Sequence, residues 1–375
     1  DIAYEKELSG IIARHLDVIE GVIPDKEVRR SVQIRAMGLL DELGNIFRGV
    51  FLINDLSPKT SDAIVSYGER LSSLIISHVI RDAQLYDSRK FIKTVKQFNR
   101  HIVDFELTNQ LIKETFSVLP KVALVPGFIS SSKDNGEVTN LGRGGSDYTA
   151  SILATALDAS ILEIWTDVDG VYSCDPRVVE GAVLLKKMSY AEAMELSYFG
   201  AKVLHPRTIA PIAQFEIPCL IKNTKNPKGP GTLISEETDL SVPIKGISDL
   251  KNVALINISG PGMKGMVGMA GRLFTAVSRA GISITLITQS SSEYSISFCI
   301  SQSELAKAKK VINAEFKLEL KDGLLNPVEI KEGCAIISVV GDGMRMVRGI
   351  SGKFFRALAE ANVNIRAIAQ GSSER

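Results

Sequence analysis

The chain has 375 residues, of which 45% are hydrophobic, and this length predicts two or three domains with ample core. The 44 basic residues nearly balance the 43 acidic ones, so the charge supports neither a nucleic-acid partner nor an anionic membrane. Four scattered cysteines form no Cys-x-x-Cys pair, which disfavours a zinc site and indicates a reduced, cytoplasmic setting. The sequence predicts neither a signal peptide nor a membrane span.

Residues 1–60 carry two apolar stripes typical of helices. The stripes consist of Ile11, Ile12, Leu16 and Ile19, and of Ala36, Leu39, Leu40, Leu43 and Phe47. A further helix is predicted to start at Ser66, in the sequence Ser-Tyr-Gly-Glu-Arg, which would place Glu69 in its first turn. There Glu69 would either complement the helix dipole or hold the ammonium group of an amino-acid substrate.

From about Lys121 the pattern changes to short apolar strands that alternate with helices. The predicted strands span residues 122–125, 161–166 and 218–221, and the predicted helices span residues 146–159 and 190–199. Such alternation is typical of a mostly parallel sheet covered by helices, so we expect an α/β domain. The turn-forming segment 223–231 would close this domain.

A glycine-rich loop stands before the predicted helix that Ser146 opens. Gly144 and Gly145 would leave backbone N–H groups exposed at the helix N-terminus, where an anion binds favourably. Arg143 offers a planar fork that suits a carboxylate or phosphate, and Asp147 adds the opposite charge, as a zwitterionic ligand requires. The alternative is a tight strand-to-helix connection without a ligand. No Lys-Ser or Lys-Thr follows the glycines, so the loop is not a Walker A motif.

A second polar cluster follows the predicted strand 161–166. Thr166 and Asp167 come just after its carboxyl end, the edge at which open α/β sheets bind ligands. One interpretation is a nucleotide pocket, in which Tyr172 covers a base and Arg177 contacts phosphate. The alternative is a simple Asp-rich turn. Lys202, in a Gly-Ala-Lys turn, is either solvated or presents its ammonium to phosphate.

The last third of the chain contains an internal repeat. Residues 254–263 align with residues 335–344 at an offset of 81, and the same offset aligns Gly268 with Gly349 and Gln289 with Gln370. A constant offset predicts a duplicated unit of strand, Gly-rich turn, helix and strand. The first copy continues into a strand that starts at Tyr294, whereas the second ends at Arg375, so we expect it to be one strand short.

On these motifs the chain resembles the aspartate kinases of the amino-acid-kinase family along essentially its whole length. The motifs are Ser-Tyr-Gly-Glu-Arg (66–70), Gly-Phe-Ile (127–129), Leu-Gly-Arg-Gly-Gly-Ser-Asp (141–147), Trp-Thr-Asp-Val-Asp-Gly-Val-Tyr (165–172), Asp-Pro-Arg (175–177) and Phe-Gly-Ala-Lys-Val-Leu-His-Pro (199–206). The repeat resembles tandem ACT regulatory modules. Residues 260–270 are most similar to threonine-sensitive bifunctional aspartate kinase–homoserine dehydrogenases, which leaves open whether a dehydrogenase follows in the parent protein.

The resemblance implies an amino-acid-kinase fold, a mostly parallel sheet sandwiched by helices, followed by α+β ferredoxin-like ACT modules. It implies a catalytic domain at residues 1–235 without its first strands, a first ACT module at 250–329, and an incomplete second one at 236–249 plus 330–375. Because such modules interleave, residues 241–248 should pair with the second copy. ACT modules also imply a homodimer or higher homo-oligomer.

The implied reaction transfers a phosphoryl group from ATP, with Mg²⁺, to the side-chain carboxylate of L-aspartate, the first step of lysine, threonine and methionine biosynthesis. The resemblance implies that L-aspartate is bound by Glu69, Phe128, Arg143, Ser146 and Asp147. It implies that ATP is bound by Thr166, Asp167, Tyr172, Arg177 and Lys202. Asp147 and Lys202 would be catalytic, Gln289 and Gln370 would contact a feedback effector, threonine or lysine, and the protein itself would hold no metal.

One departure from the family concerns the chemistry. The family's first strand carries Lys-Phe-Gly-Gly-Thr-Ser, whose lysine stabilises the transferred phosphoryl group, and this motif does not occur here. Phosphoryl transfer depends on positioning and charge neutralisation, so we expect this chain to be inactive although its parent is an enzyme. The alternative is a non-catalytic amino-acid sensor with a vestigial kinase fold. Retention of Arg143, Asp147, Asp167 and Lys202 argues against the sensor.

Overall fold

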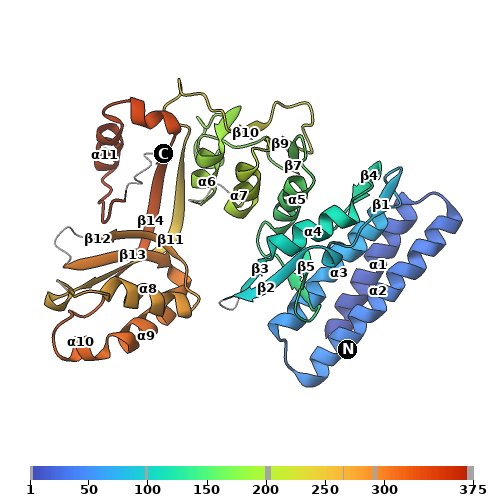
Figure 1. Ribbon diagram of the computed structural model, residues 1–375, viewed down its shortest axis with the longest axis horizontal. Coiled ribbons are helices and arrows are strands. Elements are labelled where there is room, and N and C mark those ends of the chain that lie inside the picture. Colours follow the sequence, from blue (N-terminus) through green and yellow to red (C-terminus); the bar gives the residue numbers. More distant parts are fainter. Residues whose placement is uncertain (1–2, 98–99, 199–203, 265, 290–293, 370–375) are drawn as a thin grey trace. The chain divides into compact units, whose positions relative to one another are not determined.

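The computed structural model describes residues 3–97, 100–198, 204–264, 266–289 and 294–369. The chain divides into two compact units (Figure 1). The first unit contains Asp1–Leu162 and Arg207–Ile217, and the second contains Glu163–Pro206 and Pro218–Arg375.

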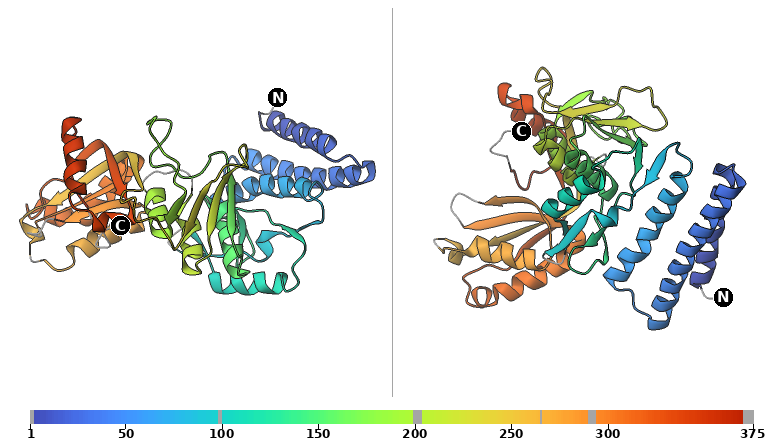
Figure 2. Two further views of the ribbon diagram at one scale, coloured as in Figure 1. Left: turned by 90° about the horizontal axis from the view of Figure 1, so that it is seen from above. Right: turned by 45° about the vertical axis from the view of Figure 1, so that its right-hand side comes forward.

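Three long helices open the first unit, α1 (Ala3–Val22), α2 (Lys26–Ile53) and α3 (Pro58–Ile76), and they lie side by side (Figures 1 and 2). Their facing stripes form one apolar cluster, in which Ile19 and Leu40 are fully buried. This cluster confirms the helices predicted from the apolar stripes in residues 1–60, because burial of one face is what holds an amphipathic helix in place.

Helix α3 starts earlier than the sequence analysis predicted. Ser57 caps it by accepting a hydrogen bond from the Thr60 backbone N–H (3.1 Å), and Pro58 occupies the first turn. Glu69 therefore lies about three turns into the helix. The prediction that the helix starts at Ser66 was wrong, and so was the dipole role for Glu69, since that effect is confined to the first turn.

The rest of the first unit contains two small sheets. Strands β1 (Ala83–Leu85) and β4 (Val122–Leu124) form a parallel pair. The other sheet has the order β3-β2-β5-β6. Its strands are β2 (Lys93–Gln97), β3 (Arg100–Val103), β5 (Ile129–Ser132) and β6 (Val138–Asn140), and the helices are η1 (Ser88–Lys90), α4 (Phe105–Thr115), α5 (Gly145–Ala156) and α7 (Pro206–Gln214).

The second unit begins with a sheet of order β7-β9-β10-β8. Its strands are β7 (Leu162–Thr166), β8 (Lys187–Ser189), β9 (Cys219–Asn223) and β10 (Thr232–Ser235), with helix α6 (Tyr190–Tyr198) after β8. Strands β4, β7 and β9 and helices α5 and α6 confirm the predicted alternation. The pairing is mixed rather than mostly parallel: β10 is parallel to β8 but antiparallel to β9, and β2 and β5 each also have an antiparallel neighbour. Each antiparallel pair is joined by a short connection.

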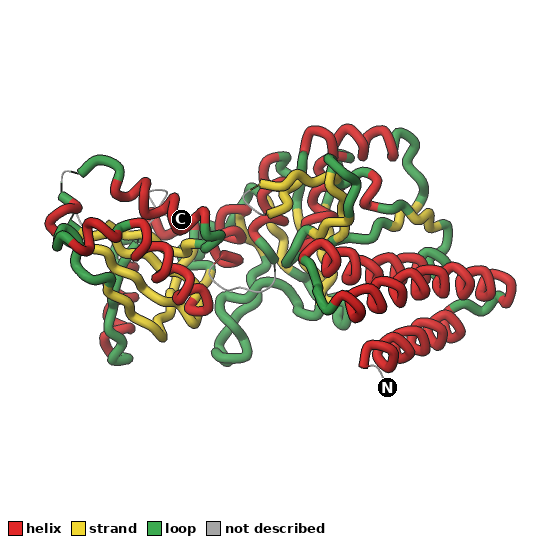
Figure 3. The backbone as a smooth tube through the Cα atoms, turned by 90° about the horizontal axis from the view of Figure 1, so that it is seen from below, coloured by secondary structure: helices red, strands yellow, loops and turns green. Residues whose placement is uncertain are grey.

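The C-terminal sheet has the order β12-β13-β11-β14. Its strands are β11 (Gly246–Ser259), β12 (Ile284–Gln289), β13 (Ser295–Ser301) and β14 (Glu329–Val340). Helices α8 (Met269–Arg279) and α9 (Leu305–Glu315) pack on one face (Figure 3), around the buried Leu273, Phe298 and Ile312. The remaining helices are η2 (Pro261–Met263), η3 (Gln302–Glu304), α10 (Lys317–Lys321), η4 (Asp342–Met346) and α11 (Ile350–Glu360).

The predicted repeat is present in this part of the fold. Both bounds of α11 follow those of α8 by 81 residues. Gly246, Ile247 and Ser248 pair with Val340, Val339 and Ser338, which confirms the predicted pairing with the second copy for these three residues. The counterpart of β12 at this offset is 365–370, and the described part of it, 365–369, forms no strand.

Candidate active site

The glycine-rich loop forms the N-terminus of α5 in the first unit. The N-cap is Gly144, in the left-handed conformation (φ 71°), and no side chain caps the helix. Arg143 and Ser146 are exposed beside it, and Asp147 is half-buried in the first turn. The helix end thus keeps the uncapped N–H groups that the two glycines predicted, and these favour an anion.

The Gly-Phe-Ile turn packs directly against this loop. A Cβ on Gly145 would lie 2.8 Å from Phe128 Cδ2, and a Cβ on Gly127 would lie 2.8 Å from the Cα of Ser146. Neither position has room for a side chain, so both glycines are required for the close approach. The Phe128 N–H donates to Thr149 Oγ1 (3.0 Å), which fixes the turn against α5. The structure therefore brings the turn that carries Phe128 against the loop that carries Ser146.

Glu69 comes from α3, which is tied to β6 just before the loop. Asn140 Nδ2 donates to the Asp62 carboxylate (3.1 Å), and Glu69 lies seven residues, about two turns, further along the same side of the helix. Burial raises the pKa of the Glu69 and Asp147 carboxyls above their usual values. Two half-buried carboxyls with one exposed guanidinium suit a ligand that carries both an ammonium and a carboxylate.

In the second unit, the end of β7 is joined to the turn after β9. The Thr166 carbonyl accepts hydrogen bonds from the Thr224 N–H (2.9 Å) and hydroxyl (3.0 Å). Asp167 is exposed at this point, and the Thr166 hydroxyl donates to its carboxylate (3.3 Å). Thr166 and Asp167 are thus held at the end of the strand, as the sequence predicted.

Asp169 organises this turn, and the sequence analysis gave it no role. Its carboxylate accepts from Asn223 Nδ2 (3.0 Å), Asn226 Nδ2 (3.1 Å) and the Tyr172 hydroxyl (3.4 Å). The bonds from Asn223 and Asn226 lower the pKa of the Asp169 carboxyl. The two asparagines in the predicted loop 223–231 were the available signal, but nothing local linked them to a residue more than fifty positions earlier.

Arg177 is exposed and pairs with Asp175. Its Nε donates to Oδ1 (2.9 Å) and its Nη2 to Oδ2 (2.8 Å), a bidentate pair that raises the pKa of the guanidinium. To contact a phosphate, Arg177 must share or leave this carboxylate. Such an exchange is feasible because exposed ion pairs contribute little stability.

The remaining predicted site residues are only partly covered by the structure. Lys202 and Gln370 lie outside the described residues. Gln289 is the last residue of β12, is exposed, and stands opposite Ile296 of β13. Over the part of the chain that the structure describes, no three His, Cys, Asp or Glu residues form a metal-binding cluster, and no helix is long and apolar enough to cross a membrane.

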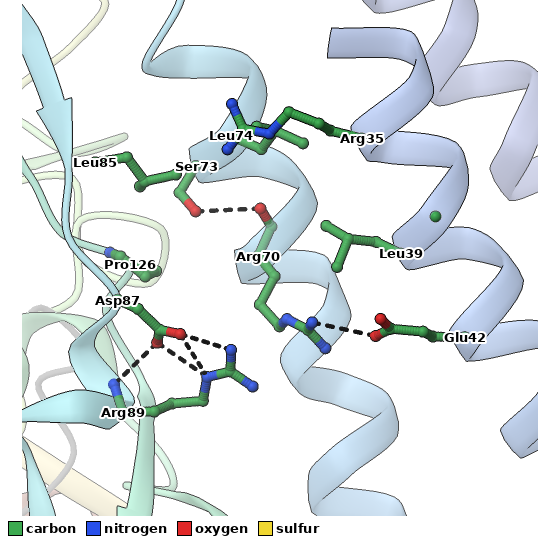
Figure 4. Close-up of a pocket in the computed structure, with 11 residues that line it drawn as sticks. Arg35, Leu39, Glu42, Arg70, Ser73, Leu74, Leu85, Asp87, Arg89 and Pro126 are labelled. Atoms are coloured by element: carbon green, nitrogen blue, oxygen red, sulfur yellow. Dashed lines mark hydrogen bonds and ion pairs between the residues drawn. The ribbon is translucent and has the colours of Figure 1, made fainter. Parts of the chain in front are cut away.

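A cavity of about 370 Å³ lies between α2, α3 and the segment after β1 in the first unit (Figure 4). Two ion pairs stand in its wall, Arg70 with Glu42 (3.3 Å) and Arg89 with Asp87 (2.6 Å). The other lining residues are Arg35, Gly38, Leu39, Ser73, Leu74, Leu85 and Pro126. The residues predicted to bind aspartate are not among them, although Arg70 directly follows Glu69 and Pro126 directly precedes the Gly-Phe-Ile turn.

Comparison with known proteins identifies the families that share this sequence and architecture. Residues 10–223 match the amino acid kinase family, and residues 256–316 and 337–375 match an ACT domain. A bifunctional aspartokinase/homoserine dehydrogenase of Haemophilus influenzae is 49% identical over 351 residues, 92% of this chain and 42% of that protein. The crystal structure of E. coli aspartokinase III in complex with aspartate and ADP (R-state) superposes with a TM-score of 0.82 at 30% identity, over 100% of this chain and 83% of that one.

The same enzyme in complex with lysine and aspartate (T-state) gives a TM-score of 0.71 at 31% identity, over 100% of this chain and 82% of that one. The chain belongs to the amino acid kinase family, and within it to the aspartokinases that carry ACT domains. The predicted fold class is thereby confirmed. The chain spans about two fifths of the length of the bifunctional relatives that it matches.

Proposed function

We propose that this chain is the aspartate kinase portion of a longer protein, and that the parent phosphorylates the side-chain carboxylate of L-aspartate with MgATP to give 4-phospho-L-aspartate. The observation that carries the proposal is the match over its full length to an aspartokinase solved with aspartate and ADP. The Gly145–Phe128 packing, which assembles two of the motifs into one surface, supports it.

In this proposal Arg143 binds a carboxylate of aspartate, and Glu69 and Asp147 face its ammonium group. Thr166, Asp167, Tyr172, Arg177 and Lys202 bind ATP. Mg²⁺ comes with the nucleotide, because it is held by phosphates together with one or two carboxylates. Asp167 suits that role, since it is exposed and has no cationic partner among the described residues. No covalent intermediate on the protein is needed, because the substrate carboxylate is itself the nucleophile.

We expect the isolated 375-residue chain to bind ligands without turning over. The family's Lys-Phe-Gly-Gly-Thr-Ser motif does not occur in it, so charge neutralisation of the transferred phosphoryl group is incomplete. Calorimetric titration should show saturable binding of ADP and of aspartate. A coupled assay for ADP release from ATP and aspartate should give a rate close to background.

The two measurements separate the alternatives. A normal turnover rate would overturn the expected inactivity but not the kinase assignment. If ADP shows no saturable binding to the folded chain, the non-catalytic sensor becomes the better description.

We further propose that an amino acid of the aspartate-derived series binds the ACT pair, with threonine preferred over lysine, and that the pair also forms a homodimer. Replacing Gln289 by alanine should weaken threonine binding about fivefold or more, because the ligand loses a hydrogen bond of about 1 kcal/mol. Titration of threonine and of lysine into both proteins measures this. Gln302→Ala, another glutamine of this sheet domain with its own partner Glu332, is the control and should leave the affinity unchanged. Equal threonine affinity in Gln289→Ala would refute the assignment of Gln289.

A further inference from the structure

Glu192, on α6, is a fully buried carboxylate that the proposed reaction does not use. Its Oε2 accepts hydrogen bonds from the Ser189 N–H (2.9 Å) and the Thr238 hydroxyl (2.7 Å). Its Oε1 accepts from the backbone N–H of Asp342 (2.9 Å). Burying a carboxylate costs free energy unless its oxygens are hydrogen-bonded, and these three bonds compensate that cost for Glu192.

A second bond links Asp342 to Ser189, the residue directly before α6. The Ser189 hydroxyl donates to Asp342 Oδ2 (2.6 Å) and accepts from the Glu192 N–H (3.0 Å). The other oxygen of Asp342, Oδ1, is buried without a hydrogen-bond partner. The start of α6 is therefore bonded twice to Asp342, in the Gly-Asp-Gly turn of the second repeat copy.

We call these bonds between the start of α6 and Asp342 the joint. The first copy has an equivalent turn that cannot form it. Both turns pack alike on their inner side: a Cβ on Gly260 would lie 2.5 Å from the Leu324 carbonyl oxygen, and a Cβ on Gly341 would lie 2.2 Å from that of Pro243. Leu324 and Pro243 are themselves 81 residues apart. The residue between the glycines differs, however, because Asp342 is replaced by Pro261, which has no N–H to donate. The bond to Glu192 is thus specific to the second copy.

A further contact leads from the second copy to the nucleotide loop. Ile247, which pairs with Val339 of that copy, donates its N–H to the Ser173 carbonyl (2.7 Å). Ser173 directly follows Tyr172, and α6 ends four residues before Lys202. The second copy is therefore bonded to two segments that lead to proposed ATP-binding residues.

We propose that the second ACT copy transmits effector binding to the ATP site, and that Glu192 is the positioning residue that carries the signal through its bond to Asp342. The inference rests on the proposed function. Linkage then requires that an effector which shifts the second copy also shifts nucleotide affinity, by a factor typically of about fivefold or more. Breaking the joint should remove this factor while each ligand alone still binds.

Asp342→Pro tests the joint by giving the second copy the Gly-Pro-Gly turn of the first. The preceding Gly341 is extended (φ 167°, ψ 127°), which a following proline accepts. The Kd of ADP is measured by calorimetry with and without saturating threonine, and again with lysine. We expect the effector to change the Kd of the original chain about fivefold or more. In Asp342→Pro the change should be less than about twofold, with the Kd of ADP alone within about threefold of the original value.

Two further variants serve as controls. Asp342→Ala keeps the N–H that bonds Glu192 and should retain part of the effect, and Pro261→Ala changes the equivalent position of the first copy and should retain all of it. If Asp342→Pro does not fold, Glu192→Leu breaks the same connection, because leucine has no atom that can accept from the Asp342 N–H.

The inference is overturned if the effector changes the Kd of ADP in folded Asp342→Pro as much as in the original chain. It is also overturned if an effector binds the original chain without changing its ADP affinity. If the original chain binds ADP and no effector amino acid, the proposed regulation fails and the inference falls with it. If it binds no ADP, the proposed kinase function itself fails.

Discussion

Replacing Thr232 by valine is expected to destabilise the second unit severely and to weaken ADP binding with it. Thr232 is fully buried, and its hydroxyl donates to the Leu185 carbonyl (2.6 Å) and accepts from the Val171 N–H (2.9 Å). Valine has the same shape but makes neither bond, so two backbone groups lose their partner. Each buried unsatisfied group costs about 1–3 kcal/mol, so the free energy of unfolding should fall by about 2–6 kcal/mol.

The functional loss follows from where these groups lie. Val171 and Leu185 bound the loop that carries Tyr172 and Arg177, so the loop loses two of its bonds to β10. Urea denaturation and ADP titration of the same variant measure the two effects. Thr232→Ser keeps the hydroxyl and should recover most of both, whereas Thr224→Val changes an exposed threonine and should lower stability by less than about 1 kcal/mol. Wild-type stability in Thr232→Val would contradict the role of this hydroxyl.

Much of the fold could be predicted because its signals are local. The offset of 81 that aligns Gly268 with Gly349 also relates the bounds of α8 and α11, since the same Gly-rich turn and apolar pattern specify each helix. The glycines before α5 likewise predicted its uncapped N-terminus. The start of α3 also has a local signal, Ser57-Pro58, but the apolar residues after Ser66 predict a later start.

The groups that hold the candidate sites together could not be predicted in this way. Glu192 meets Asp342 after 150 positions, and Asp169 meets Asn223 after 54. Each is an ordinary polar residue in its local sequence. Only the packing of α6 against β14 brings Glu192 to Asp342, and only the neighbouring of β7 and β9 brings Asp169 to Asn223. The motifs therefore identify residues that face a ligand, whereas the residues that position them emerge only from the fold.

Replacing Arg143 by alanine should lower aspartate affinity more than any other single change in the first unit. A hydrogen bond to a charged group contributes about 1.5–3 kcal/mol, so loss of one such bond between Arg143 and a carboxylate should raise the Kd of aspartate about 10- to 150-fold. Stability should change by less than about 0.5 kcal/mol, because Arg143 is exposed and has no ion-pair partner among the described residues. Calorimetric titration of aspartate in the presence of ADP measures the affinity.

Two variants decide whether the loss is specific. Arg143→Lys keeps the charge but not the planar fork, so it should recover only part of the affinity. Arg177→Ala, in the nucleotide loop, should weaken ADP binding and leave the Kd of aspartate alone unchanged. If Arg143→Ala binds aspartate as tightly as the original chain, the exposed guanidinium beside the α5 N-terminus is not the carboxylate ligand, and the uncapped N–H groups in the first turn of α5 must bind the anion by themselves.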